Sequence, residues 1–205
     1  MSTAAAAIMR RMIPSAAFES ESDAALMRRF AGGEARAFDA LYDRHEMKVW
    51  RFILRSVRNR AIAEELMQEV WFGVARQARN WRPEAKFTTW LFTLARHRMI
   101  DAHRAGRIAQ ASESVDQAGN PVVDKLPAGA GSNPALQLET LQQRHGLIAA
   151  VESLPPEQRE AFLLQAEGEL SVVDIAALTE VTFETAKSRL RYARATLKLL
   201  LKELT

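Results

Sequence analysis

The chain has 205 residues, 48% of them hydrophobic and 26% charged, which is enough for one large domain or two small domains with buried cores. It contains no cysteine, so disulfides, thiolate nucleophiles and cysteine-based zinc sites are excluded. No apolar run approaches the ~18 residues that a membrane span needs. The formal net charge is only +3, so the position of the charges is more informative than their sum.

Residues 1–22 have the composition of a disordered tail. Residues 1–7 are rich in alanine, and the pair Arg10-Arg11 is followed closely by Pro14 and Glu19. An export signal needs an apolar stretch of about 7–15 residues after its charges, and this tail has none. We therefore expect a frayed N-terminus on a cytoplasmic protein.

Between residues 23 and 106 the apolar residues recur at helical spacing. Ser22 or Asp23 can cap a short first helix that ends at Gly32-Gly33. The second helix is expected to bury one stripe, made of Phe38, Leu41, Tyr42, Val49, Phe52 and Ile53.

A third helix is predicted from about Ala61 and a fourth from about Thr88 to Arg104, with a break at residues 80–83. The third helix is amphipathic. Its apolar side carries Ile62, Leu66, Val70 and Val74, and its polar side carries Glu64, Glu65, Gln68 and Glu69.

Residues 107–135 differ in kind, because Ser, Ala, Gly, Asn and Pro dominate and no periodicity is sustained. Such a long stretch is typical of a flexible linker. The sequence therefore predicts an all-α chain of two small helical domains, residues 23–106 and 136–205, on either side of this linker.

The second domain carries clear boundary signals. Pro156 and Glu157 mark a helix start, and a capping box of Ser171 and Asp174 marks the next one. After a turn at residues 179–181, Thr182 is expected to cap a long final helix. Two helices across such a turn are the signature of a helix-turn-helix.

Charge is strongly divided within this domain. Residues 146–184 contain eight acids and one base, whereas residues 185–202 contain six bases and no acid. On a helical wheel Ala186, Leu190 and Ala193 face the core, while Lys187, Ser188 and Arg191 face away from it. Such a helix suits the major groove of DNA.

Some of these bases do not require a role in DNA binding. Lys198 and Lys202 lie near a helix C-terminus, where the helix dipole favours cations in any case. Arg189 lies close to the core side, so packing, an ion pair and DNA contact all remain open for it.

The first domain has a basic region of its own, with seventeen bases against ten acids over residues 23–107. Aromatic residues alternate with these bases between positions 76 and 107, a composition that suits single-stranded nucleic acid. Phe87 and Phe92 are expected in the core. Trp81 in the loop and Trp90 on a helix flank are expected to be available for base stacking.

Four segments resemble conserved motifs of the bacterial sigma-70 family. Residues 63–71 (AEELMQEVW) and 87–98 (FTTWLFTLARHR) are similar to conserved segment two. Residues 154–159 (LPPEQR) and 185–190 (TAKSRL) are similar to conserved segment four. The two segments without segments one and three resemble the extracytoplasmic-function, or group IV, sigma factors.

The resemblance implies a non-enzymatic transcription initiation factor that needs no cofactor, metal or small-molecule substrate. Its expected partners are promoter DNA, the β′ clamp helices and the β subunit of core RNA polymerase, and an anti-sigma factor, without membrane insertion. A stress or envelope-response regulon is the expected target. The polymerase-binding residues implied are Glu64, Glu65, Leu66, Gln68, Glu69 and Val70.

The resemblance also assigns the DNA contacts. The residues implied in melting the −10 element are Arg76, Asn80, Trp81, Lys86, Trp90, His97 and Arg98. The residues implied in reading the −35 element are Thr185, Lys187, Ser188, Arg191, Tyr192 and Arg194. Members of the family often have glycine in the helix-turn-helix turn where this chain has Glu180, which would be strained if the turn requires positive φ.

The alternative function is that of a stand-alone helix-turn-helix regulator. It accounts for the C-terminal domain but leaves the motifs at residues 63–71 and 87–98 unexplained. An enzyme is disfavoured because the chain has no G-x-S-x-G motif, no phosphate-binding loop and no metal-spaced cluster.

Overall fold

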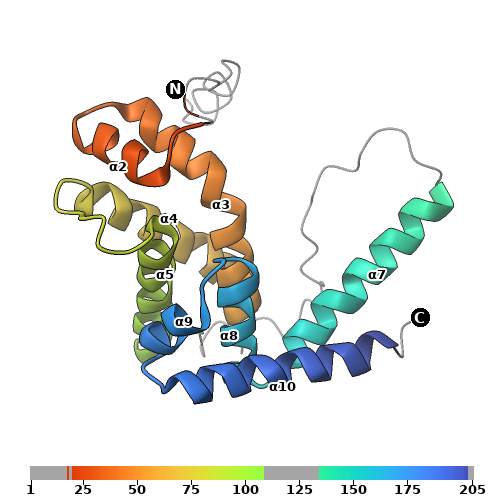
Figure 1. The fold of residues 1–205 in the computed structure, drawn as a ribbon. Coiled ribbons are helices and arrows are strands. Elements are labelled where there is room, and N and C mark those ends of the chain that lie inside the picture. Colours follow the sequence, from red (N-terminus) through yellow and green to blue (C-terminus); the bar gives the residue numbers. More distant parts are fainter. Residues whose placement is uncertain (1–17, 19, 109–133, 203–205) are drawn as a thin grey trace.

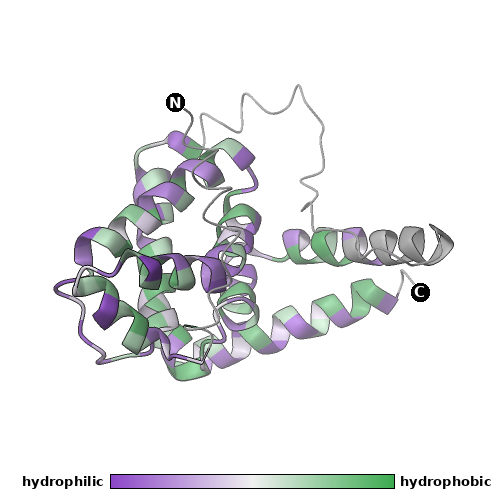
Figure 2. Cartoon of the chain, turned by 90° about the horizontal axis from the view of Figure 1, so that it is seen from above, coloured by the Kyte–Doolittle hydropathy of each residue, from purple (hydrophilic) through white to green (hydrophobic). Residues whose placement is uncertain are grey.

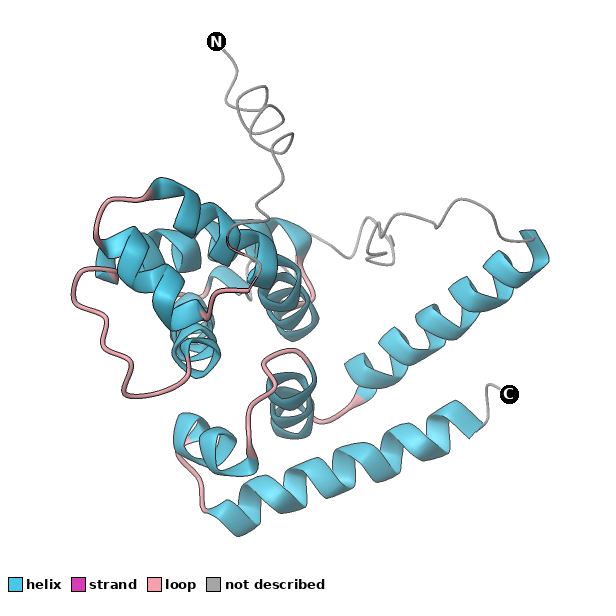
Figure 3. Cartoon of the chain, turned by 45° about the horizontal axis from the view of Figure 1, so that its top comes forward, coloured by secondary structure: helices cyan, strands magenta, loops and turns pink. Residues whose placement is uncertain are grey.

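The computed structural model describes residues 18, 20–108 and 134–202, the side chains of residues 134–142 and 144 excepted. Every regular element within those residues is an α-helix, which confirms the expected fold class (Figures 1 and 3). The N-terminal bundle consists of α2 (Asp23–Ala31), α3 (Ala35–Val57), α4 (Arg60–Gln77) and α5 (Phe87–Arg104). The C-terminal bundle consists of α7 (Pro134–Ser153), α8 (Pro156–Ala166), α9 (Val172–Thr179) and α10 (Phe183–Lys202).

Local capping explains where the first helices begin. The Ser22 side chain accepts a hydrogen bond from the Ala25 N–H at 3.3 Å, as expected for the cap of α2. The Asn59 side chain does the same for α4, accepting from the Ile62 N–H at 3.1 Å. Each cap satisfies a backbone donor that the first turn of a helix leaves free.

The core of the N-terminal bundle forms along the predicted stripe of α3. Leu41, Val49, Phe52 and Ile53 are buried there, and Leu66, Val70 and Val74 are buried on α4. Tyr42 is half-buried, and its ring lies 4.8 Å from that of Trp71, which joins α3 to α4 through an aromatic contact.

The expectation that residues 1–22 form a frayed tail is wrong for its last residues. Phe18 is only 6% exposed, and the guanidinium of Arg29 lies 4.5 Å from the centre of its ring. Arg44 on α3 donates hydrogen bonds to the carbonyls of Phe18 and Glu21 at 3.1 and 3.0 Å. Residues 1–17 and 19 lie outside the described residues. Phe18 is the one large apolar residue between Ile13 and Leu26, so the sequence held no periodic signal from which this contact could be predicted.

Asp23, the first residue of α2, fixes this end of the bundle to α3. Its carboxylate lies 2.5 Å from Arg44 and 2.9 Å from His45 Nε2. Burial alone would raise the pKa of Asp23, but the hydrogen bonds and charges of His45 and Arg44 together lower it. The carboxylate is therefore held ionised where α2 meets α3.

The C-terminal bundle follows its sequence signals closely. The predicted capping box is present, because Ser171 Oγ accepts from the Asp174 N–H and Asp174 accepts from the Ser171 N–H, both at 3.1 Å. Thr182 caps α10 by accepting from the Thr185 N–H at 3.2 Å. Ala186, Leu190 and Ala193 of α10 are buried as the wheel predicts, and Leu197 is buried with them, against α7, α8 and α9.

The two bundles are in contact, which the sequence did not predict. α8 packs against α3, and the buried residues of both bundles form one continuous cluster. Figures 1 and 2 show α7 and α10 extending beyond this shared body toward the same side. The predicted linker lies largely outside the described residues, and its last two positions belong to α7, which begins at Pro134. Among the described residues, none of the helices combines the length and the apolar character that crossing a bilayer requires.

Candidate nucleic-acid interface

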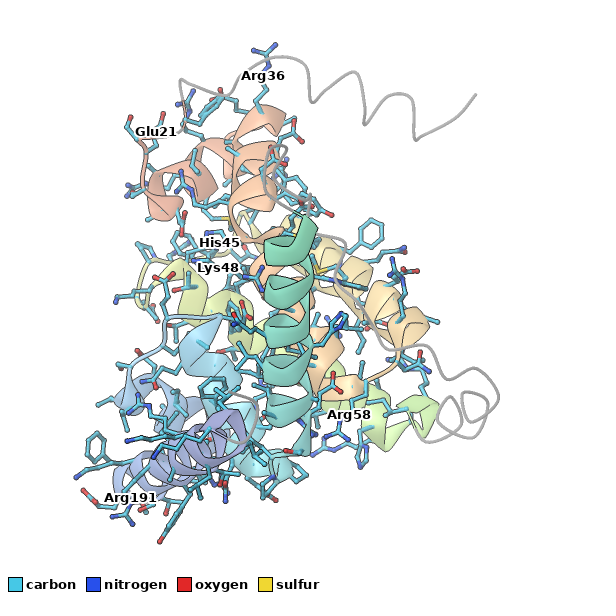
Figure 4. The ribbon with its side chains drawn as sticks, turned by 90° about the vertical axis from the view of Figure 1, so that its right-hand side faces the viewer. Glu21, Arg36, His45, Lys48, Arg58 and Arg191 are labelled. Carbon is cyan, nitrogen blue, oxygen red and sulfur yellow. The ribbon has the colours of Figure 1, made fainter. Side chains whose placement is uncertain are left out.

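The outer face of α10 is the first candidate interface. Lys187, Arg191 and Tyr192 are exposed, and Ser188 is half-buried. Figure 4 places Arg191 on α10, far from Lys48 and His45 on α3. Because the opposite face of α10 is buried, these side chains are presented outward from a rigid helix, as groove reading requires.

The side chains on this face differ in how strongly they are held. The Arg191 guanidinium lies 4.9 Å from the ring centre of its neighbour Tyr192, which supports it without neutralising its charge. The Lys187 ammonium lies 3.6 Å from the Glu184 carboxylate and 5.8 Å from the ring centre of Phe183, so both contacts are loose. Arg194 is bound to the Gln165 side chain on α8, so it is less free to reach a ligand.

The turn between α9 and α10 does require positive φ at Glu180, so the strain expected for a residue other than glycine is present there. Glu180 has φ 58° and ψ 40°, the left-handed region that favours glycine. The N–H of Val181 reaches the carbonyl of Ala176 at 3.0 Å, and that of Glu180 reaches Ala177 at 3.3 Å, so the turn closes α9 in the manner of a Schellman motif.

Replacing this glutamate should relieve the strain. We expect Glu180→Gly to raise the free energy of unfolding by about 1 kcal/mol, since L-residues disfavour the left-handed region by roughly that amount. Urea unfolding followed by circular dichroism measures the change. Glu180→Ala is the matched control, because it removes the carboxylate and keeps the strain. A glycine variant no more stable than the alanine variant would contradict the interpretation.

The polar side of α4 forms an acidic surface that we define as Glu64, Glu65, Gln68 and Glu69. The first three are exposed, and Glu69 is half-buried. Leu66 and Val70, which the resemblance includes among the polymerase contacts, are fully buried. Their position allows them to support α4 from beneath, but not to touch a partner.

This acidic surface already has a cation beside it. Arg107, just beyond α5, donates to Glu65 at 2.8 Å and to Glu69 at 2.9 Å. The hydrogen bond with Glu69 is the largest of the influences that raise the pKa of Arg107. The sequence did not indicate this contact, because Arg107 lies 38 residues from Glu69.

The expectation that Trp81 is available for base stacking is wrong. Trp81 is only 9% exposed, and its ring centre lies 6.3 Å from the ring centres of both Phe87 and Trp90. Phe87 in turn lies 5.4 Å from the ring of His45. The loop after α4 thus folds back and buries the indole, because a large aromatic ring gains more by joining a core than by facing water. Trp90 is half-buried and retains an accessible edge.

Five further residues implied in −10 contact are accessible to different degrees. Arg76, Asn80, Lys86 and His97 are exposed, and Arg98 is half-buried, with an ion pair to Asp101 at 3.8 Å. His97 and Arg98 line a cavity of about 430 Å³ with Arg96 and Arg104. Arg76 and Arg98 line another of about 440 Å³ between α4 and α5.

Phe72 is a surface residue that was not among those expected from the sequence. It is 66% exposed on α4 and lines the second cavity together with Glu69, Arg76 and Arg98. A large apolar ring on the polar side of an amphipathic helix was the signal available in the sequence. Its position joins the acidic surface to the basic residues of the loop and α5.

Comparison with protein families matches both bundles. Sigma-70 region 2 matches residues 41–108, and Sigma-70 region 4 matches residues 144–197. The RNA polymerase sigma factor CarQ of Myxococcus xanthus is 34% identical over 178 residues, covering 87% of this chain and 97% of the relative. The ECF RNA polymerase sigma factor SigL of Mycobacterium tuberculosis is 33% identical over 181 residues, covering 85% of this chain and 94% of the relative. The chain belongs to the extracytoplasmic-function sigma factors of the sigma-70 family.

Two solved structures share the fold. The sigma factor RpoE of Bartonella quintana, in complex with the anti-sigma factor NepR, matches with a TM-score of 0.59 at 25% identity, covering 80% of this chain and 96% of that one. CnrH, in complex with the cytosolic domain of CnrY, matches with a TM-score of 0.58 at 21% identity. The match covers 89% of this chain and 99% of CnrH. The fold of this sigma factor is therefore shared with the solved sigma factor RpoE.

Proposed function

We propose that this sigma factor binds core RNA polymerase through α4 and directs transcription initiation by contacting two promoter elements. The observation that carries the proposal is the match to both sigma-70 regions in a chain whose α10 presents exposed cations on its outer face. A stand-alone regulator would account for α10 alone.

The proposed division of labour follows the chemistry of each surface. Lys187, Ser188 and Arg191 on α10 read the −35 element in the major groove, and Thr185, Tyr192 and Arg194 contact the flanking backbone. The loop after α4 and the exposed face of α5 engage the −10 element, where cations follow the strand and the accessible edge of Trp90 meets a base.

The acidic surface of α4 is the proposed site for the β′ clamp helices, and the C-terminal bundle is the proposed site for the β subunit. Phe72 beside Glu69 supplies the aromatic anchor that protein interfaces favour. An anti-sigma factor is also a proposed partner, because the solved sigma factor RpoE is in complex with one. The cytoplasm is the proposed location, and a stress or envelope response is the proposed regulon.

Promoter binding with and without core polymerase tests the function against the alternative. A sigma factor should shift a promoter fragment specifically only when core polymerase is present. Specific, tight binding of a duplex by the purified chain alone would favour the stand-alone regulator instead.

A further inference from the structure

Phe183 is the first residue of α10, and it exposes a large apolar ring to water. Val181, two positions earlier, packs against the core, whereas Phe183 remains 46% exposed. Burying a phenyl ring is favourable, so an exposed ring at an ordered position is available to a partner. The polar contacts with DNA that are proposed for α10 leave this ring without a role.

The cap of α10 holds Phe183 in place. Thr182 accepts a hydrogen bond from the Thr185 N–H at 3.2 Å, and the hydroxyl oxygens of these two threonines lie 2.8 Å apart. The capped turn includes Phe183, so its backbone is already ordered in the free chain. Burying the ring against a partner therefore requires little further loss of backbone entropy.

Phe183 lies one helical turn before Lys187, on the same side of α10. The Lys187 ammonium is 5.8 Å from the centre of the Phe183 ring. Side chains of a helix lean toward its N-terminus, so the ring extends beyond Lys187 toward the turn of the helix-turn-helix. In helix-turn-helix proteins the N-terminal residues of the recognition helix contact base edges. The ring thus lies on the part of α10 that is proposed to enter the groove.

The chemistry of a phenyl ring limits what it can recognise in DNA. The ring donates and accepts no conventional hydrogen bond, so it cannot pair with the polar groups of a base edge. Among the four unmodified bases, only thymine presents an apolar group in the major groove, its C5 methyl. The neighbouring Glu184 has a side chain that is 74% exposed, and a phosphate would repel its carboxylate. A base edge therefore suits this end of α10 better than the DNA backbone does.

We propose that Phe183 is a specificity-determining residue whose ring contacts the C5 methyl group of a thymine in the −35 element. The proposal rests on the proposed function, because it requires α10 to lie in the major groove. It adds one apolar contact to the polar contacts proposed for Lys187, Ser188 and Arg191.

Selection of promoters by the holoenzyme tests the proposal. Core polymerase with the full-length chain is mixed with duplexes that carry a start site mapped for the wild type and a randomised −35 region, and the bound duplexes are sequenced. The wild type should enrich thymine at one or more positions. Phe183→Ala should lose the preference for thymine at one of them and keep the preferences at the other positions.

Removal of the methyl group measures the contact itself. In a duplex of the selected sequence, deoxyuridine in place of that thymine should weaken binding of the wild-type holoenzyme by about fourfold, as expected when one methylene-sized group loses its burial. The Phe183→Ala holoenzyme should bind the two duplexes equally well. Phe183→Leu keeps an apolar side chain and should retain part of the difference.

Leu199→Ala is the matched control for loss of an exposed apolar side chain. Leu199 is 66% exposed and lies near the other end of α10. This variant should respond to deoxyuridine as the wild type does. All three variants should co-purify with core polymerase as the wild type does, and circular dichroism should show the same helix content.

The outcomes separate this proposal from the proposed function. If the wild type and Phe183→Ala enrich the same −35 sequence, the proposal is overturned and the proposed function stands. Equal weakening of both holoenzymes by deoxyuridine would overturn it as well. Loss of polymerase binding by a folded Phe183→Ala variant would overturn it by assigning the ring to a protein contact. If the wild type binds polymerase but enriches no −35 sequence, the proposed reading of that element fails, and this proposal fails with it.

Discussion

Replacing both Lys187 and Arg191 by alanine should lower transcription from a −35-dependent promoter by about ten- to a hundredfold. The loss of a contact with a base edge costs ~1–3 kcal/mol of binding free energy. Both side chains are exposed on the outer face of α10, and neither is held by a strong ion pair. Their loss therefore removes contacts with DNA while the buried face of α10 stays packed. Run-off transcription with saturating core polymerase measures the effect.

A second double variant distinguishes groove reading from general electrostatics. Lys198→Ala with Lys202→Ala removes the same two charges from the far end of α10, where both lysines are exposed. We expect this control variant to lose only a little transcription. Both variants should co-purify with core polymerase as the wild type does. Equal losses from the two variants, or loss of polymerase binding by the Lys187 and Arg191 variant, would contradict the placement of the −35 surface.

Reversing the charge of Glu65 and Glu69 to lysine should weaken core polymerase binding by about tenfold or more, because like charges across an interface cost several kcal/mol. The two glutamates lie on the acidic surface of α4, where Arg107 is their partner within the chain. The variant loses the attraction between the two carboxylates and a basic partner, and it places two new lysines beside Arg107. A pull-down with core polymerase at low concentration measures the affinity.

Two comparisons make that test specific. Asp39→Lys with Asp43→Lys makes the same reversal on α3 and should leave polymerase binding near that of the wild type. Arg107→Ala frees the same carboxylates without altering them, so it should bind polymerase at least as tightly as the wild type. Undiminished binding by the Glu65 and Glu69 variant would mean that polymerase docks elsewhere.

The helices and caps of this chain could be predicted because their causes are local. Ser22, the Ser171 and Asp174 box and Thr182 each act within three residues along the chain. The buried face of α10 followed in the same way, because a helix fixes which residues share a side. Even the strain at Glu180 could be anticipated from the residue type that its turn requires.

The contacts that could not be predicted join residues far apart in sequence. Glu167 pairs with Arg55 across 112 residues, and Arg107 pairs with Glu69 across 38. The sequence shows an excess of acidic residues before α10, but it does not show which basic residues those acids contact. Trp81 was misjudged for a related reason, since its burial depends on a loop folding back onto α5.

Transcription from purified components tests whether this chain directs polymerase to promoters through two separate DNA contacts. Core polymerase, the purified chain and genomic fragments are combined, and the 5′ ends of the transcripts are mapped. We expect transcription starts that depend on the chain and share two upstream elements, and we expect these starts to be lost when either element is replaced. Transcripts that do not depend on the chain, or starts that need only one element, would contradict it.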